Sequence, residues 1–430
     1  MSMSPPFREI DRCRVCGNED LEDILSLGEQ YVIDFLNSED DPSLKSPLDL
    51  SLCNLAEGGC GLLQLRHTVN PDLMYRQYWY KSGINENMVE SLRDVATRSE
   101  ELARLSPGDL VLDIGCNDGT MFNLFNTPNI RFVGFEPARN LIGEASATGA
   151  IVMNDYFNAL AFNQQSERKK AKLITSIAMF YDLDDPNSFV RDIDRCLDDE
   201  GVWTLQMAYL PDKLKTNAFD ETSAEHLGYY TLNTLQHLMN RNNLEVFDFE
   251  TNNVNGGSLR AYIRKKGASV EGFNDADSRL ERKLAEEMEL GLNDKRVYEE
   301  FATRVEHLKE RTYNFIAGEV ARGKKVYVYG ASTKGNTLLQ YYGLDKRLIT
   351  AAAERNPAKY GRLIVGSHIP IIPEEDARAD ADYFLALPWH FIDTFVKREY
   401  EFLQRGGKFI APLPELKVIG RDDVSGIKDE

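Results

Sequence analysis

The segment from Val111 to Gly119 holds the residues of this sequence that are best suited to binding a cofactor. It reads Val-Leu-Asp-Ile-Gly-Cys-Asn-Asp-Gly, so a β-branched strand runs into a glycine turn that a helix is expected to follow. Such a turn places a ligand over the carboxyl ends of the strands. A dinucleotide would need the middle glycine of G-x-G-x-x-G, because its pyrophosphate approaches the backbone closely. That glycine is absent, and S-adenosylmethionine, which has no pyrophosphate, is the better match.

The residues predicted to bind this cofactor lie in the turn and at the ends of the next two strands. They are Asp113, Gly115, Asn117, Gly119, Glu136 and Asp155. Asp113 is expected to lie near the ammonium group of the cofactor. Glu136, 23 residues further on, suits the two ribose hydroxyls. Asp155 is placed to meet the adenine amino group.

Four of the six cysteines crowd the first sixty residues, and their spacing predicts a metal site. Cys13 and Cys16 form a knuckle with two intervening residues, and Cys53 and Cys60 supply a second pair. Four thiolates complete the tetrahedral coordination of a structural Zn²⁺ and leave no open position for catalysis. The alternative is four unrelated buried cysteines.

The segment 219–230 contains the candidate acid–base group. Glu225 directly precedes His226, and a neighbouring carboxylate can tune a side chain whose ordinary pKa lies near neutrality. Tyr230, at the end of the segment, is predicted to contact the substrate. The alternative is a solvated loop histidine.

Two further segments are candidate parts of a binding site. Residues 75–83 are rich in aromatic side chains, among them Tyr78 and Tyr80, and form either a substrate wall or the packing of one domain on another. The loop 330–335 contains Lys334 between a strand and a helix, which is a pattern that binds anions. The alternative for this loop is a surface turn that caps the helix.

The elements that position these residues alternate between strand and helix. Short β-branched runs predict strands at 110–115, 131–136, 151–154, 172–177 and 201–206. Segments 244–250 and 258–263 flank Asn255-Gly-Gly257, which is a hairpin signal. A parallel sheet that ends in an antiparallel hairpin is the architecture of class I methyltransferases rather than of dehydrogenases.

The 430 residues suggest two or three domains at roughly 150 residues each. We predict an α/β protein with a small zinc-binding module at 1–75 and a class I methyltransferase domain at 76–268. A helical connector is predicted at 269–322, followed by a Rossmann-like α/β domain at 323–430. The strands of this last domain are predicted at 326–329, 348–352, 383–387 and 408–411.

The charge balance of the chain excludes some classes of partner. Lys and Arg total 50 against 69 Asp and Glu, for a net charge of −19, which disfavours broad binding of nucleic acid or anionic membranes. No apolar run approaches the roughly 20 residues that span a bilayer, and the N-terminus has no signal-peptide pattern. We therefore expect a cytoplasmic protein whose thiols are reduced.

Together these motifs resemble the sugar C-methyltransferase family, which methylates nucleotide-linked 4-keto-deoxysugars. The resemblance covers nearly the whole chain, and the order of its motifs is specific. The matching segments are Cys13-Arg-Val-Cys16-Gly, Asp-Ile-Gly-Cys-Asn-Asp-Gly119, Glu225-His226-Leu-Gly-Tyr-Tyr230, Asn255-Gly-Gly-Ser-Leu-Arg260 and Tyr329-Gly-Ala-Ser-Thr-Lys-Gly-Asn336. Where relatives usually carry Tyr and His before the Glu-His pair, this chain has Ser223 and Ala224.

The resemblance implies a reaction and roles for the residues. A sugar nucleotide would lie between the methyltransferase domain and a cofactor-free C-terminal domain. His226 would act as base on carbon 3, with Glu225 and an upstream tyrosine, Tyr80 or Tyr78, in the active site. For the diphosphate, Lys334 would supply the positive charge, and Arg355 and Arg260 are the next candidates.

The chemistry is consistent with these roles, because a ketone at carbon 4 acidifies the hydrogen at carbon 3 and its enolate can accept a methyl group. A tyrosine hydroxyl near the ketone could stabilise the enolate. Two alternatives stay open at this point: an O- or N-methyltransferase of a small metabolite, and a non-enzymatic zinc-ribbon interaction protein. The sugar, the nucleotide, the stereochemistry and the oligomeric state are not determined by the sequence.

Overall fold

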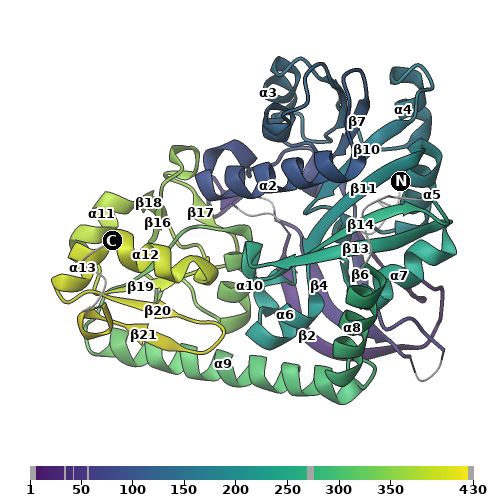
Figure 1. Ribbon diagram of the computed structural model, residues 1–430. Helices are drawn as coiled ribbons and strands as arrows, with labels where there is room; N and C mark the ends of the chain where they lie inside the picture. The colour runs from purple at the N-terminus through teal and green to yellow at the C-terminus, as the bar shows by residue number, and fades with distance from the viewer. Residues whose placement is uncertain (1–5, 33–34, 42, 56–57, 269–275, 425–430) are drawn as a thin grey trace, which may run out of the picture.

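The computed structural model describes residues 6–32, 35–41, 43–55, 58–268 and 276–424, and three sheets dominate the architecture (Figure 1). The central sheet has seven strands in the order β13-β14-β11-β10-β7-β8-β9. Their bounds are β7 Leu110–Ile114, β8 Arg131–Phe135, β9 Ile151–Met153, β10 Ala171–Ile177, β11 Leu197–Ala208, β13 Leu244–Asn252 and β14 Ser258–Lys265. All strand pairs are parallel except those of β14, which is antiparallel to β11 and to β13. The prediction of a class I methyltransferase fold is confirmed.

The burial of the central strands explains why this sheet forms. Every residue of β7 is buried, as a parallel strand covered on both faces requires. The helices and short 3₁₀ segments that accompany the strands of this sheet along the chain include α2 Glu86–Ala103, α3 Ile142–Ala147, α4 Ala159–Gln165, η3 Phe180–Asp182, α5 Pro186–Cys196, α6 Leu210–Thr216, η4 Phe219–Glu221 and α7 Leu232–Arg241. Since β7, β8 and β10 are parallel neighbours, the residues that follow them meet at one edge. That edge carries the site.

The N-terminal segment forms a four-stranded antiparallel sheet that borrows a strand from the methyltransferase segment. Strands β2 Leu21–Tyr31, β4 Lys45–Cys53 and β5 Leu63–Leu65 are joined by β12 Gly228–Tyr229, which pairs with β5. A second small sheet pairs β1 Phe7–Glu9 with β6 His67–Val69, and α1 spans Asp72–Tyr75. Because β12 begins two residues after His226, this pairing fixes the candidate base against the N-terminal module.

The predicted connector contains two helices, α8 Ala276–Glu289 and α9 Lys295–Ala321, while its first residues, 269–275, lie outside the described part of the chain. In Figure 1, α9 runs along the lower edge of the molecule from α8 past the C-terminal sheet. The buried side chains of α9 recur at helical spacing: Tyr298, Phe301, Val305, Leu308, Thr312, Ile316 and Glu319. They share one hydrophobic core with β4 and with the C-terminal sheet.

The C-terminal unit is a six-stranded sheet in the order β18-β16-β15-β19-β20-β21, in which only β21 is antiparallel to its neighbour. The strands are β15 Val326–Tyr329, β16 Ala352–Glu354, β18 Ile371–Pro373, β19 Tyr383–Ala386, β20 Lys408–Ala411 and β21 Lys417–Ile419. The helices are α10 Thr333–Tyr342, α11 Glu374–Asp380, α12 Ile392–Arg398 and α13 Tyr400–Gln404. A short pair, β3 Phe35–Leu36 with β17 Leu363–Ile364, joins this unit to the N-terminal segment.

One predicted strand is misplaced. The run 348–352 was expected to be extended, but β16 begins only at Ala352. The backbone N–H groups of Leu348 and Ile349 donate to the Asp345 carbonyl at 3.0 and 2.9 Å, which holds these residues in a turn. Local hydrogen bonding has therefore overridden the β propensity of the run.

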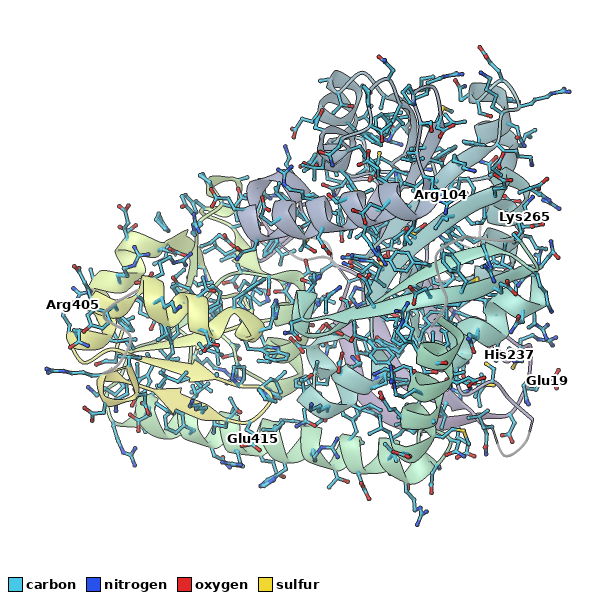
Figure 2. All side chains as sticks on the ribbon, in the orientation of Figure 1. Glu19, Arg104, His237, Lys265, Arg405 and Glu415 are labelled. Atoms are coloured by element: carbon cyan, nitrogen blue, oxygen red, sulfur yellow. The ribbon has the colours of Figure 1, made fainter. Side chains whose placement is uncertain are left out.

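Charged side chains cover the outside of the molecule (Figure 2). Arg104, His237, Arg405 and Glu415 are exposed. Among the described residues, no helix has the length and apolar character to cross a membrane.

Candidate active site and zinc site

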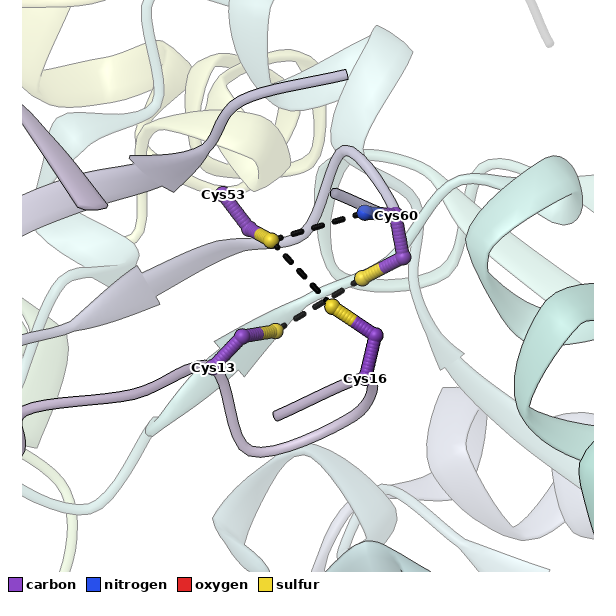
Figure 3. A group of neighbouring side chains, drawn as sticks. All are labelled: Cys13, Cys16, Cys53 and Cys60. Carbon is purple, nitrogen blue, oxygen red and sulfur yellow. Dashed lines mark hydrogen bonds between the residues drawn. The ribbon is translucent and has the colours of Figure 1, made fainter. Parts of the chain in front are cut away.

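The four predicted metal ligands come together in one cluster (Figure 3). Their sulfur atoms all lie within 4.8 Å of one another. The Sγ atoms of Cys13 and Cys60 are 3.6 Å apart, and those of Cys16 and Cys53 are 3.4 Å apart. Four sulfurs at about 2.3 Å from a tetrahedral zinc would be separated by roughly 3.8 Å, so the set fits Zn²⁺.

The location of this cluster argues for a structural metal. None of its four cysteines lines the active-site cavity. The Thr234 hydroxyl in α7 donates to the Cys60 carbonyl at 3.2 Å, and Tyr230 packs between the cluster and Phe180. Zinc would thus hold the N-terminal segment against the methyltransferase sheet without meeting substrate.

A single cavity of about 620 Å³ contains most of the predicted site residues. Its lining comes from four parts of the chain: the segment 68–92, the edge of the central sheet, the segment 220–227 and the loops of the C-terminal unit. Predicted residues that line it are Asp113, Gly115, Asn117, Glu136, Asp155, Tyr78, Tyr80, Glu225, His226 and Lys334. The N-terminal segment, the methyltransferase segment and the C-terminal unit therefore all contribute to the cavity.

Asp113 in β7 and Glu136, which directly follows the neighbouring parallel strand β8, both line this cavity. Asp113 Oδ1 accepts a hydrogen bond from the Thr175 hydroxyl of β10 at 2.7 Å, and burial raises the pKa of Asp113 to about 7. Both oxygens of Glu136 accept backbone N–H groups, from Asn117 at 2.9 Å and Ala138 at 2.8 Å. These bonds orient the carboxylate, and each oxygen keeps a lone pair for a further donor.

The glycines of the turn have different roles. Gly115 lines the cavity at φ +74°, which favours glycine. Gly119 lies away from the cavity, and a Cβ there would stand 2.8 Å from the Cα of Ala145 in α3. Gly119 is therefore explained by the close packing of α3 rather than by ligand contact.

Asn117 and Asp155 tie the cofactor end to the aromatic segment. The Asn117 side chain accepts from Ser82 N at 3.0 Å and donates to the Tyr80 carbonyl at 3.2 Å. Asp155 Oδ1 accepts from Arg76 at 3.3 Å and from the Tyr156 backbone N–H at 2.9 Å. The segment 75–83 thus forms both a wall of the cavity and a packing surface.

His226 lies at the acceptor end in a defined orientation. Its Nδ1 is 2.6 Å from the Glu221 carbonyl oxygen, and its ring contacts the Tyr181 ring at a centroid distance of 4.5 Å. A carbonyl can only accept, so Nδ1 carries the proton and Nε2 keeps its lone pair. Burial and the positive charge of Lys334 lower the pKa of His226 to about 4.

Lys334, at the start of α10, reaches across to this histidine through Glu221. Its Nζ is 2.8 Å from Glu221 Oε1, and the two side chains are 27% and 7% exposed. Burial opposes ionisation of Glu221, but Lys334 and the buried Lys213 hold its pKa below the ordinary value. The cation predicted for the diphosphate therefore also balances a buried carboxylate beside the candidate base.

Three predicted substrate residues lie away from the cavity. Tyr230 is 1% exposed and belongs to the core. Arg260 is 2% exposed because its guanidinium pairs with Asp94 at 2.8 Å and with Glu250 at 3.3 Å. Arg355 is exposed on the C-terminal unit. Of the three, Arg260 alone has an indirect link, because its Nε donates to Gln206, which lines the cavity, at 2.8 Å.

Sequence reasoning missed several cavity residues that carry polar groups. They are Tyr75, Tyr181, Asp182, Asp220 and His390. The signal that could have revealed Asp182 is its place in the segment that follows β10, the strand that pairs with the Asp113 strand. The others are brought in by tertiary packing.

The two departures from the family pattern have different surroundings. Ser223 lines the cavity, and its buried hydroxyl makes no hydrogen bond within the described part of the protein. Ala224 is 9% exposed and packs in the hydrophobic core. The serine at 223 therefore changes the cavity surface, whereas the alanine at 224 changes the packing behind it.

Comparison with known families covers most of the chain. Residues 13–75 match a zinc binding domain, residues 85–248 a methyltransferase domain, and residues 253–414 the C-methyltransferase C-terminal domain. The C-methyltransferase NovU of Streptomyces niveus is 33% identical over 425 residues, which cover 98% of this chain and 99% of that protein.

The chain belongs to the C-methyltransferase family. This assignment agrees with the predictions of a methyltransferase, of S-adenosylmethionine as cofactor and of a zinc-binding N-terminal segment. It decides for carbon against an oxygen or nitrogen acceptor, and for an enzyme against an interaction protein.

Two solved methyltransferase structures resemble part of this C-methyltransferase. A S-adenosylmethionine-dependent methyltransferase from Clostridium acetobutylicum is 12% identical with a TM-score of 0.33, covering 42% of this chain and 92% of that one. Magnesium protoporphyrin IX methyltransferase from Synechocystis, with bound SAM, is 11% identical with a TM-score of 0.29, covering 42% and 79%. Likenesses of this size support no conclusion about function.

The thiolate cluster predicts one zinc ion per chain. The double variant Cys13→Ser/Cys16→Ser should lose it, because two hydroxyls replace half of the thiolate ligands. Cys196→Ser is the matched control, because Cys196 is buried but lies outside the cluster. The Cys196→Ser protein should therefore keep its zinc. Elemental analysis of the purified proteins measures this, and zinc retained in the double variant would contradict the assignment.

The geometry of Glu136 predicts an order of cofactor affinities. Glu136→Gln keeps one acceptor oxygen, whereas Glu136→Ala leaves two backbone N–H groups and the ribose hydroxyls unpaired. Affinity for S-adenosylmethionine should fall in the order wild type, Gln, Ala, with a loss of about 10- to 100-fold for Ala. Calorimetry checks this, with Glu144→Ala as the control outside the cavity. Equal affinities in all variants would remove Glu136 from the site.

Proposed function

We propose that this C-methyltransferase transfers a methyl group from S-adenosylmethionine to carbon 3 of a nucleotide-linked 4-keto-deoxysugar. The observation that carries the proposal is the orientation of His226. Its Nδ1 is held by the Glu221 carbonyl, and His226 lines the same cavity as Asp113, Glu136 and Lys334. A base that shares a cavity with the predicted cofactor carboxylates and with a cation suits an acceptor whose reacting carbon is acidic and whose far part is a diphosphate.

His226 would act on the sugar as a general base. Because Nδ1 is held by the Glu221 carbonyl, Nε2 is the atom that takes the proton from carbon 3. The electrons of that C–H bond move into the ketone and form an enolate. Bound S-adenosylmethionine would supply the electrophilic methyl group: the enolate carbon accepts it, the S–CH₃ bond breaks, the neutral thioether S-adenosylhomocysteine is the leaving group, and the ketone is restored.

The anionic part of the acceptor would lie at the loop that begins α10. Ser332, Thr333 and Lys334 line the cavity there, at the N-terminus of a ten-residue helix. Helix N-termini favour anions, and Lys334 is partly exposed although it pairs with Glu221. In a chain with a net charge of −19, a local cation of this kind is what a diphosphate requires.

His226→Asn should abolish proton removal from the acceptor. Asparagine keeps a hydrogen-bond donor but has no basic nitrogen, and general-base catalysis is worth roughly 10²- to 10⁴-fold in rate. Exchange of the carbon 3 hydrogen with deuterated water, followed by NMR on thymidine- or uridine-diphosphate 4-keto-6-deoxyglucose without cofactor, should be lost in this variant. S-adenosylmethionine should still bind.

The matched control for this experiment is His237→Asn, because His237 is exposed and does not line the cavity. It should exchange and methylate like the wild type. Wild-type exchange in His226→Asn would assign the base to another residue. Absence of exchange in the wild type with every 4-keto sugar nucleotide would overturn the proposed function.

The lowered pKa of His226 predicts the pH dependence of kcat/KM. Because burial and Lys334 lower that pKa to about 4, the imidazole is neutral and active at higher pH and loses its base only as pH falls through about 4. We expect no loss of kcat/KM from His226 between about pH 7.5 and 5.5. Lys334→Gln removes a positive charge and leaves Glu221 negative. The pH at which kcat/KM begins to fall on the acid side should therefore move up toward 6.5. An acid limb near 6.5 in the wild type would contradict the buried, neutral histidine.

A further inference from the structure

Asp182 lines the same cavity as Asp113 and His226. It is the last residue of η3, which follows β10, and β10 pairs with the strand that carries Asp113. The preceding residue, Tyr181, contacts the His226 ring. Asp182 lines the cavity beside Tyr75 and Glu225. An acceptor bound next to His226 would therefore be in the same cavity as this carboxyl group and close to the residue that precedes it.

The surroundings of Asp182 favour its neutral form. Its Oδ1 atom is buried and has no hydrogen-bond partner in the described part of the protein. Burial and the negative charge of Glu225 raise the pKa of Asp182 well above its ordinary value, and a hydrogen bond with Tyr75 only partly offsets them. A protonated carboxyl group differs from a carboxylate because it can donate a hydrogen bond.

We propose that Asp182 is a further catalytic residue, a carboxylic acid that donates a hydrogen bond to the ketone oxygen of the acceptor as the enolate forms. This role rests on the proposed function. The carbon 3 proton goes to His226, Asp182 keeps its own proton, and the ketone is restored when the carbon accepts the methyl group. A donor aimed at a developing oxyanion is worth about 10²- to 10³-fold in rate when the site excludes water.

Other groups of the cavity are less suited to this role. Tyr80, one of the two tyrosines that the sequence predicts for the active site, is 42% exposed. Asp220 also has a buried oxygen without a hydrogen bond, but burial raises its pKa only to about 6 because Lys334 opposes the shift. Asp220 is therefore ionised at neutral pH and can only accept. Tyr75 donates to the Glu225 carbonyl at 3.2 Å, which makes it a positioning residue.

The test compares Asp182→Asn with Asp182→Ala on the two 4-keto-6-deoxyglucose nucleotides named above. Asparagine has an N–H donor but no titratable proton, so kcat should stay within about tenfold of the wild type. Alanine has no donor, so kcat should fall by about 10²- to 10³-fold. Asp185→Asn is the matched control, because Asp185 is exposed and caps α5, where asparagine caps equally well.

The pH profile separates this role from a structural one. Ionisation of Asp182 removes the donor, so the wild type should lose kcat/KM as pH rises through the pKa of Asp182, and Asp182→Asn should lack that alkaline limb. The titratable groups that face Asp182 are Glu225, Tyr75, Tyr181 and Tyr229, and they are unchanged in both variants. Calorimetry should give wild-type affinity for S-adenosylmethionine in both, which shows that they fold.

Three results would overturn the role of Asp182. Wild-type kcat in Asp182→Ala would show that the carboxyl group is not needed. Loss of carbon 3 exchange in Asp182→Asn, to the same extent as in Asp182→Ala, would make Asp182 a base rather than a donor. Absence of carbon 3 exchange in the wild-type enzyme would overturn the proposed function and the role of Asp182 with it. This failure differs from a failure of the Asp182 role alone, because it is seen in the wild type and needs no variant.

Discussion

The contacts of Glu221 are the constraint on which the acceptor side of this enzyme depends. Its backbone carbonyl fixes the tautomer of His226, and its buried carboxylate binds Lys334 from the C-terminal unit. A buried charge without its partner is strongly destabilising, so these two segments, 113 positions apart in sequence, are held together. Burial and the positive charge of Lys334 keep the imidazole neutral, and the negative charge of Glu221 only partly opposes them.

A second constraint comes from strand β12, which belongs to the methyltransferase segment but completes the sheet of the N-terminal module. The strand begins two residues after His226, and the thiolate cluster stabilises the module against which it pairs. The N-terminal module is therefore more than an accessory domain. It determines where the candidate base lies, although none of its cysteines reaches the cavity.

The cavity also separates its carboxyl groups by chemical state. Glu136 accepts two backbone N–H groups and suits ribose hydroxyls, whereas Asp220 lies near Lys334 and stays ionised. Asp182 has the negative charge of Glu225 beside it and a buried oxygen without a hydrogen bond. Carboxyl groups in one cavity can thus serve as acceptors or as a donor, according to the charges and N–H groups around each of them.

The sequence by itself determined the cofactor end and the metal cluster, because the residues concerned are close together along the chain or follow regular strands. Asp113 and Glu136 end two neighbouring parallel strands, and strand order in such sheets follows general rules. Only the tertiary structure decided which charges remain available to a ligand. Asp94 and Glu250 neutralise Arg260, and no sequence pattern shows that the ion pairs form. The chemical state of Asp182 likewise depends on a carboxylate 43 residues away in sequence, since electrostatic and burial effects follow distance in space rather than along the chain.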